Sequence, residues 1–88
     1  GWYASRTTHV HFIITASGHS SATSQLFFDE ALTTAVYTQH GAYSARGNKD
    51  TTNASDNVAR GLTLSTVLMT VSQQSDGVLL ASKTLTIA

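Results

Sequence analysis

The chain has 88 residues, with five Lys and Arg against five Asp and Glu, so its formal net charge is zero and charged residues make up only 11% of it. Nucleic acids and anionic membranes are bound through clustered Lys and Arg, so this composition argues against both as partners. The sequence also lacks cysteine, and no apolar run is long enough for a transmembrane helix. We therefore expect a single small domain over residues 1–88 with a thin core.

The first predicted element is a strand from Thr8 to Thr15, a stretch rich in β-branched and aromatic residues. Side chains of a strand alternate between its two faces, so His9 and His11 point the same way. The opposite face is predicted to be buried and consists of Val10, Phe12 and Ile14.

The two histidines allow two interpretations. An isolated His-x-His pair is most simply a solvated strand face. Tyr3 and Arg6 lie just before the pair, however, and a phenolate with two imidazoles is a ligand set that suits an oxidised metal such as Fe(III). Structural zinc prefers thiolate and imidazole ligands. The pattern therefore favours a ferric site formed by Tyr3, His9 and His11.

A polar turn is predicted for residues 16–23, followed by a second strand over residues 24–28. In this strand Gln25 and Phe27 share one face. If the two strands pair antiparallel, Gln25 lies near the two histidines; otherwise it is an exposed strand residue. His19, in the turn, is predicted to lie on the surface.

Asp29 is a good N-cap for a short amphipathic helix that we place over residues 29–38. Residues 39–61 are polar and without sustained periodicity, so we expect a long loop, with His40 at the surface. This loop contains the sequon Asn53-Ala54-Ser55, which predicts N-glycosylation at Asn53 and is consistent with secretion.

Residues 62–72 and 78–88 form two alternating runs that predict two strands. The intervening Ser75-Asp76-Gly77 is a hairpin signal, since Gly supplies the positive φ that such turns need. Met69 and Trp2 are interpreted as packing residues.

Three segments together resemble a known family. Residues 1–12 read Gly-Trp-Tyr-Ala-Ser-Arg-Thr-Thr-His-Val-His-Phe, similar to the Gly-x-Tyr…Arg-x-x-His-[Ile/Val]-His segment of the intradiol ring-cleavage dioxygenases, above all their secreted, fungal-type branch. Residues 23–29, Thr-Ser-Gln-Leu-Phe-Phe-Asp, resemble the strand that follows the histidines in that family. Residues 43–53 resemble the loop after the short helix in the secreted branch.

The resemblance implies a role for each matching residue. Members of this family hold a non-haem Fe(III) ion with two tyrosinates and two histidines. Tyr3 matches the tyrosine that substrate displaces, and His9 and His11 match the histidines. Arg6 matches an arginine that stabilises negative charge on the substrate, and Gln25 matches a glutamine that lines the pocket. The implied catalytic residues are thus Arg6, Gln25 and Tyr3.

The resemblance also implies the fold. It predicts a mainly β protein, part of an antiparallel β-sandwich of the intradiol dioxygenase type, with one short helix and a long loop. The first tyrosine ligand of the family would precede Gly1, so we expect the chain to be the C-terminal portion of such a domain. A proteolytic product, a partial chain and a natural half-domain remain open as explanations.

Two functions follow from these observations. The first is an intradiol dioxygenase, or its iron-binding part, that cleaves catechol-type aromatic rings with O2 at Fe(III) in a secreted protein. The second is a secreted structural β-domain that self-assembles into oligomers or filaments, or joins the missing N-terminal half, through unpaired strand edges. The first function needs bound iron, and the second does not.

Overall fold

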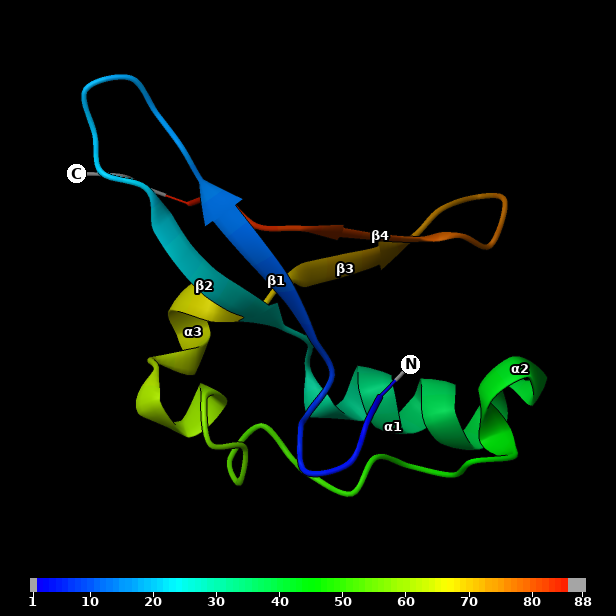
Figure 1. Ribbon diagram of the computed structural model, residues 1–88. Coiled ribbons are helices and arrows are strands. Elements are labelled where there is room, and N and C mark those ends of the chain that lie inside the picture. Colours follow the sequence, from blue (N-terminus) through cyan, green and yellow to red (C-terminus); the bar gives the residue numbers. More distant parts are fainter. Residues whose placement is uncertain (1, 86–88) are drawn as a thin grey trace.

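The computed structural model describes residues 2–85, which form two β-hairpins, a ten-residue helix and several short helical turns. Strand β1 (His9–Ile14) pairs antiparallel with β2 (Ala22–Phe27), and β3 (Thr70–Gln73) pairs antiparallel with β4 (Leu79–Ser82). Figure 1 shows both hairpins in the upper half of the molecule and the helices with their connecting segments in the lower half.

The first hairpin brings Gln25 to the two histidines, the outcome expected if its strands pair antiparallel. His11 lies opposite Gln25 and His9 opposite Phe27, so these four side chains share one face of the sheet. The connecting turn contains Gly18 at φ +78°, a left-handed conformation that glycine adopts without steric cost. The predicted antiparallel pairing of the two strands is confirmed.

The predicted helix is also confirmed, as α1 (Glu30–Gln39). The carboxylate of Asp29 accepts a hydrogen bond from the amide of Ala31 at 3.1 Å, as expected of an N-cap. Buried Tyr37 connects the helix to the residue just before β1, because its hydroxyl lies 2.6 Å from Oγ1 of Thr8.

Residues 39–61 are more ordered than a long loop. They contain α2 (Gly41–Ser44) and a 3-10 turn, η1 (Ala59–Gly61). Four polar residues of this segment are buried, and each forms hydrogen bonds: Lys49, Thr51, Asn53 and Asp56. The prediction of a loop missed these residues because polar side chains that bond to backbone groups leave no periodic pattern in a sequence.

The strand predicted for residues 62–72 is wrong over its first half, which forms the helical turn α3 (Leu64–Val67). The helical turn forms because three apolar residues have helical spacing: Leu64, Val67 and Leu68. In a helix this spacing places all three on the side that packs on the core. The strand itself begins at Thr70.

The second hairpin is shorter than predicted. Its turn is the expected one, with Gly77 at φ +88° and the amide of Gln74 donating to the carbonyl of Val78 at 2.7 Å. Strand β4 covers only Leu79–Ser82 and is exposed throughout, and residues 86–88 of the predicted strand lie outside the described residues.

The core is thin, as expected for this length. It consists of Phe27, Ala59 and Val67, with Leu26, Leu64 and Leu68 packed against it. A parallel bridge joins Phe27 to Leu68, and the amide of Met69 donates to the carbonyl of Phe27 at 2.9 Å, so the end of β2 is connected to the start of the second hairpin.

The apolar face of β1 is less buried than predicted. Val10 is 46% exposed, and Phe12 and Ile14 are only half-buried. The described part of the chain packs too little against this side of the sheet to cover it. At a coarser level the prediction of antiparallel β structure holds: the described residues form a small mixed fold with two two-stranded antiparallel sheets.

Within residues 2–85, every helix is too short or too polar to cross a membrane.

Candidate functional site

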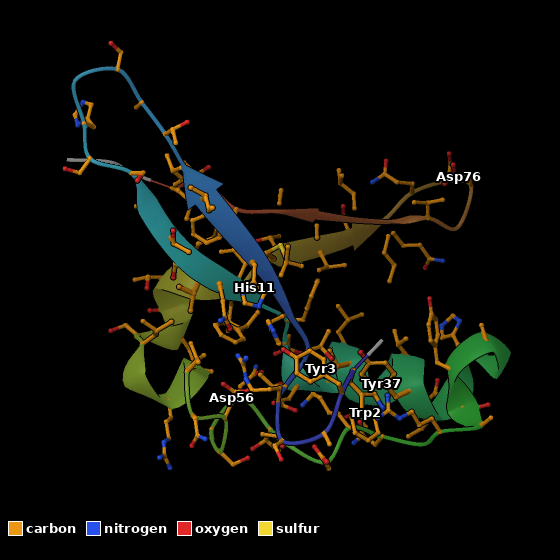
Figure 2. All side chains as sticks on the ribbon, viewed as in Figure 1. Trp2, Tyr3, His11, Tyr37, Asp56 and Asp76 are labelled. Atoms are coloured by element: carbon orange, nitrogen blue, oxygen red, sulfur yellow. The ribbon has the colours of Figure 1, made fainter. Side chains whose placement is uncertain are left out.

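Tyr3, His9 and His11 converge at the start of β1. The Nε2 atoms of His9 and His11 lie 3.2 Å apart, and the hydroxyl of Tyr3 lies 3.0 Å from Nε2 of His9. The three rings meet edge to face, at centroid distances of 5.4 Å for Tyr3 with His9 and 4.9 Å for His9 with His11. Figure 2 shows Tyr3 and His11 close together near the start of β1, with Asp56 to one side. The structure thus brings together the three predicted ligands.

A tight turn places Tyr3 over the strand. The amide of Arg6 donates to the carbonyl of Tyr3 at 3.3 Å, and Ser5 within the turn has φ +68°, which is uncommon for a residue other than glycine. Both carboxylate oxygens of Asp50 accept from the amide of Ser5, at 3.1 and 3.3 Å. The turn is therefore held by Asp50, which lies 45 residues later in the chain, and not by its neighbouring residues alone.

His9 is oriented by the backbone. Its Nδ1 lies 2.7 Å from the carbonyl oxygen of Thr7, which can only accept, so Nδ1 carries the proton. In the neutral ring this leaves a lone pair on Nε2, the atom that faces Tyr3 and His11. Such a hydrogen bond on the distal nitrogen is the usual companion of a metal-binding histidine.

Two distances between donor atoms, both measured from Nε2 of His9, fit a shared metal ion. Two donors that each lie about 2.1 Å from an ion are about 3.0 to 3.4 Å apart at ordinary coordination angles. The separations of 3.0 and 3.2 Å match this range. Three or more His, Cys, Asp or Glu side chains do not gather into a metal site anywhere within residues 2–85, so a metal bound here would need the phenolate of Tyr3 as its third ligand. That donor set suits Fe(III) better than zinc.

The guanidinium of Arg6 lies beside the three candidate ligands. Its Nη2 donates to Oε1 of Gln25, and its Nη1 lies 3.5 Å from Nε2 of His9. Arg6 and Gln25 therefore border the same site, as the sequence predicted. The site is open to solvent, since Tyr3 is 55% exposed and His11 is also exposed.

Asp56 is a functional candidate that the sequence reasoning missed. Its fully buried carboxylate forms an ion pair with Nε of Arg6 at 2.7 Å. Burial alone would raise the pKa of Asp56, but hydrogen bonds from Arg6 and from the amides of Ala59, Thr7 and Val58 outweigh burial and hold that pKa well below its usual range. No motif identified Asp56, because its partner lies 50 residues away in the sequence.

The other two tyrosines lie elsewhere. Tyr37 bonds to Thr8 and forms an edge-to-face pair with Tyr43, with ring centroids 6.2 Å apart. Among the tyrosines of residues 2–85, Tyr3 is thus the one that contacts His9. His19 and His40 are exposed, as predicted.

Asn53 is buried, although its sequon predicts a surface position. It is 4% exposed, its Nδ2 donates to the carbonyl of Phe28 at 2.8 Å, and its Oδ1 accepts from the hydroxyl of Thr7 at 2.7 Å. A glycan on Nδ2 would require this buried side chain to become exposed. Glycosylation at Asn53 stays a prediction, and this fold disfavours it.

Comparison of the chain with protein-family models, with curated proteins and with solved structures found no match. The resemblance to the intradiol dioxygenases consequently rests on the residue pattern, and the site has to be judged by its geometry.

Proposed function

We propose that this chain carries the ferric site of a secreted intradiol-type dioxygenase that cleaves catechol-type aromatic rings with O2. The observation that supports this best is the convergence of Tyr3, His9 and His11, with donor atoms 3.0 and 3.2 Å apart, beside Arg6 and Gln25. These five residues are the ones that the resemblance implies, and they come from two strands and the turn before the first.

The three ligands would hold the ion on one side and leave the solvent side open for substrate. A bound Fe(III) ion would supply Lewis-acid activation and a template for a catechol. His9 is suited to hold it because its hydrogen bond to the carbonyl of Thr7 fixes the tautomer with a free Nε2.

Tyr3 is suited to exchange with substrate. It is 55% exposed and its ring has only edge contacts, so it can move away from the histidines at little cost in packing. Once released, its phenolate oxygen can accept a proton from a catechol hydroxyl. The chain thus provides both a ligand and a base in one side chain.

Arg6 supplies fixed positive charge beside the ligands. Two of its nitrogens bond to Asp56 and Gln25, which leaves Nη1 directed toward His9. A guanidinium so held stabilises negative charge that develops on a bound aromatic ring, without having to reorganise during the reaction. Gln25, bonded to Nη2, limits the positions that the guanidinium can take.

The sandwich fold belongs to the same proposal. The half-exposed apolar face of the first hairpin, formed by Val10, Phe12, Ile14 and Leu26, is the kind of surface that a second β-sheet covers in a sandwich. Further strands on this face would complete the core that the described residues leave thin.

Oxygen uptake tests the proposed reaction. The chain loaded with ferric iron should consume O2 and catechol in equal amounts and form a ring-opened diacid, and His9→Ala should abolish the uptake. The matched control is His19→Ala, an exposed histidine in the β1–β2 turn, which should retain it. Equal uptake by the loaded chain and the His9→Ala variant would contradict the proposal.

A second function, assembly of copies of this chain without catalysis, is supported by a different observation. Strand β4 is an edge strand in the described sheet, and its leucines, Leu79 and Leu80, are 45% and 53% exposed. The strand itself lacks charge, and the chain has no net charge and no proline to oppose edge pairing. Sedimentation should then show oligomers that Leu80→Lys converts to monomers. Monomers in the parent chain at high concentration would exclude this function.

A further inference from the structure

We infer that Asp56 is the positioning residue of this site: it holds the guanidinium of Arg6 beside His9 and Gln25 in the orientation that a bound catecholate requires. This inference rests on the proposed function, but the placement of Arg6 by Asp56 can be tested without it. The carboxylate is fully buried, and it accepts hydrogen bonds from Arg6 and from three backbone amides.

The two oxygens of Asp56 have separate tasks. Oδ1 accepts from the amides of Val58 and Ala59, at 2.8 and 3.0 Å, and so begins the turn η1. Oδ2 accepts from Nε of Arg6 at 2.7 Å and from the amide of Thr7 at 2.8 Å. The side chain of Asp56 therefore holds the turn η1 with Oδ1 and holds Arg6 beside the site with Oδ2.

The contacts of Oδ2 fix both ends of the Arg6 side chain. The amide of Thr7 belongs to the next residue in the chain, so this bond sets the backbone from which Arg6 projects, while the bond to Nε sets the plane of the guanidinium. With Nε engaged, Nη2 meets Gln25 and Nη1 faces His9. The negative charge of Asp56 also offsets the positive charge of Arg6, so the guanidinium can lie close to the proposed metal site.

Asp56→Asn separates these tasks. The amide oxygen of Asn can still accept from Val58 and Ala59, but its NH2 group would face two other donors, Nε of Arg6 and the amide of Thr7. The variant should keep η1 and release Arg6. Asp50→Asn is the matched control, because it makes the same chemical change in the same segment at a carboxylate that bonds to Ser5 and not to Arg6.

The first measurement uses the metal-free full chain. The Nε–H signal of Arg6, assigned with Arg6→Lys, should exchange with water at least tenfold faster in Asp56→Asn than in the parent chain and in Asp50→Asn. Unchanged exchange would overturn the inference. A scalar coupling across the hydrogen bond between Nε of Arg6 and the carboxyl carbon of Asp56 can be measured in the parent chain, so that a failure of Asp56→Asn to fold does not prevent the test. Absence of this coupling would overturn the inference as well.

The second measurement uses the ferric chain and 4-nitrocatechol as the probe. Asp56→Asn should weaken binding of the probe about as much as Arg6→Gln does, and the double variant should show no further loss, since both changes remove one interaction. Full affinity in Asp56→Asn together with weak binding in Arg6→Gln would show that Asp56 only stabilises the fold, and would overturn the inference. If the parent chain binds no iron, the proposed function fails, and the exchange measurement still decides whether Asp56 positions Arg6.

Discussion

The Nε2 atoms of His9 and His11 lie 3.2 Å apart on one face of β1, and the hydrogen bond from Nδ1 of His9 to Thr7 leaves Nε2 of His9 without a proton. Two nitrogens at this distance either share a proton or share a metal ion. Tyr3 lies 3.0 Å from the same atom, so the three ligands of the proposed ferric site meet around Nε2 of His9.

Replacement of one histidine should remove the metal site and keep the fold. His11 is exposed, so His11→Ala should change the free energy of unfolding by no more than about 0.5 kcal/mol. It should lower the affinity for ferric iron by more than about 100-fold, because loss of a ligand should cost more than loss of a hydrogen bond that only orients a ligand. Iron titration followed by denaturation measures both effects; a variant that retains parent affinity would show that His11 is not a ligand.

Tyr3→Phe should remove the colour of the ferric chain and leave its stability unchanged. A charge-transfer band requires a phenolate on the metal, and Tyr3 is the tyrosine in contact with His9. The comparison variant is Tyr43→Phe, a half-exposed tyrosine that contacts Tyr37 instead. If Tyr43→Phe lost the band and Tyr3→Phe kept it, the ligand assignment would be wrong.

Asp56 should make the fold sensitive to acid. Its pKa is held well below its usual range in the folded chain, against about 3.9 for an unperturbed Asp. The unfolded chain therefore takes up this proton first as pH falls, so the stabilisation by Asp56 is complete above about pH 4 and is lost progressively below it.

Asp56→Asn tests this dependence. At neutral pH it should lower the free energy of unfolding by about 1.5 to 3 kcal/mol, the usual value of a hydrogen bond to a charged group. Below about pH 4 the difference from the parent chain should shrink, because the parent then loses the same interaction. Urea unfolding at several pH values measures the difference; a constant difference down to pH 2 would exclude this linkage.

The turn before β1 should depend on a residue that tolerates positive φ. Ser5 adopts φ +68°, so Ser5→Val should cost about 1 to 2 kcal/mol in stability, since a β-branched side chain is strained in the left-handed region. Because this turn places Tyr3 over His9, the same variant should weaken iron binding. Ser5→Gly is the matched control and should retain both properties. Equal behaviour of the two variants would show that the turn does not set the site.

The sequence predicted the shared face of the first hairpin better than the fold around it. Strand alternation was enough to put His9 and His11 on one face, and antiparallel pairing was enough to bring Gln25 opposite His11. These predictions succeeded because period-two geometry is local and the hairpin connection is short. The N-cap at Asp29 succeeded for the same reason.

The errors arose where long-range contacts decide the structure. Asp56 contacts residues about fifty positions earlier, and nothing in its neighbourhood distinguishes it from an exposed loop aspartate. The strand prediction fails at α3 because Leu64 and Leu68, four residues apart, fit a period of two as well as a helical period, and packing of Leu64, Val67 and Leu68 with Phe27 selects the helix. The sequon at Asn53 likewise gave no sign that its side chain is buried.

The most direct test of the account is the visible spectrum of the purified chain, recorded with its iron content. The account predicts about one ferric ion per chain and a tyrosinate charge-transfer band that Tyr3→Phe abolishes, because the hydroxyl of Tyr3 and Nε2 of His11 both lie within 3.2 Å of Nε2 of His9. A chain that remains colourless and takes up no iron when ferric salt is supplied would contradict it, and would leave the convergence of these three side chains without a catalytic role.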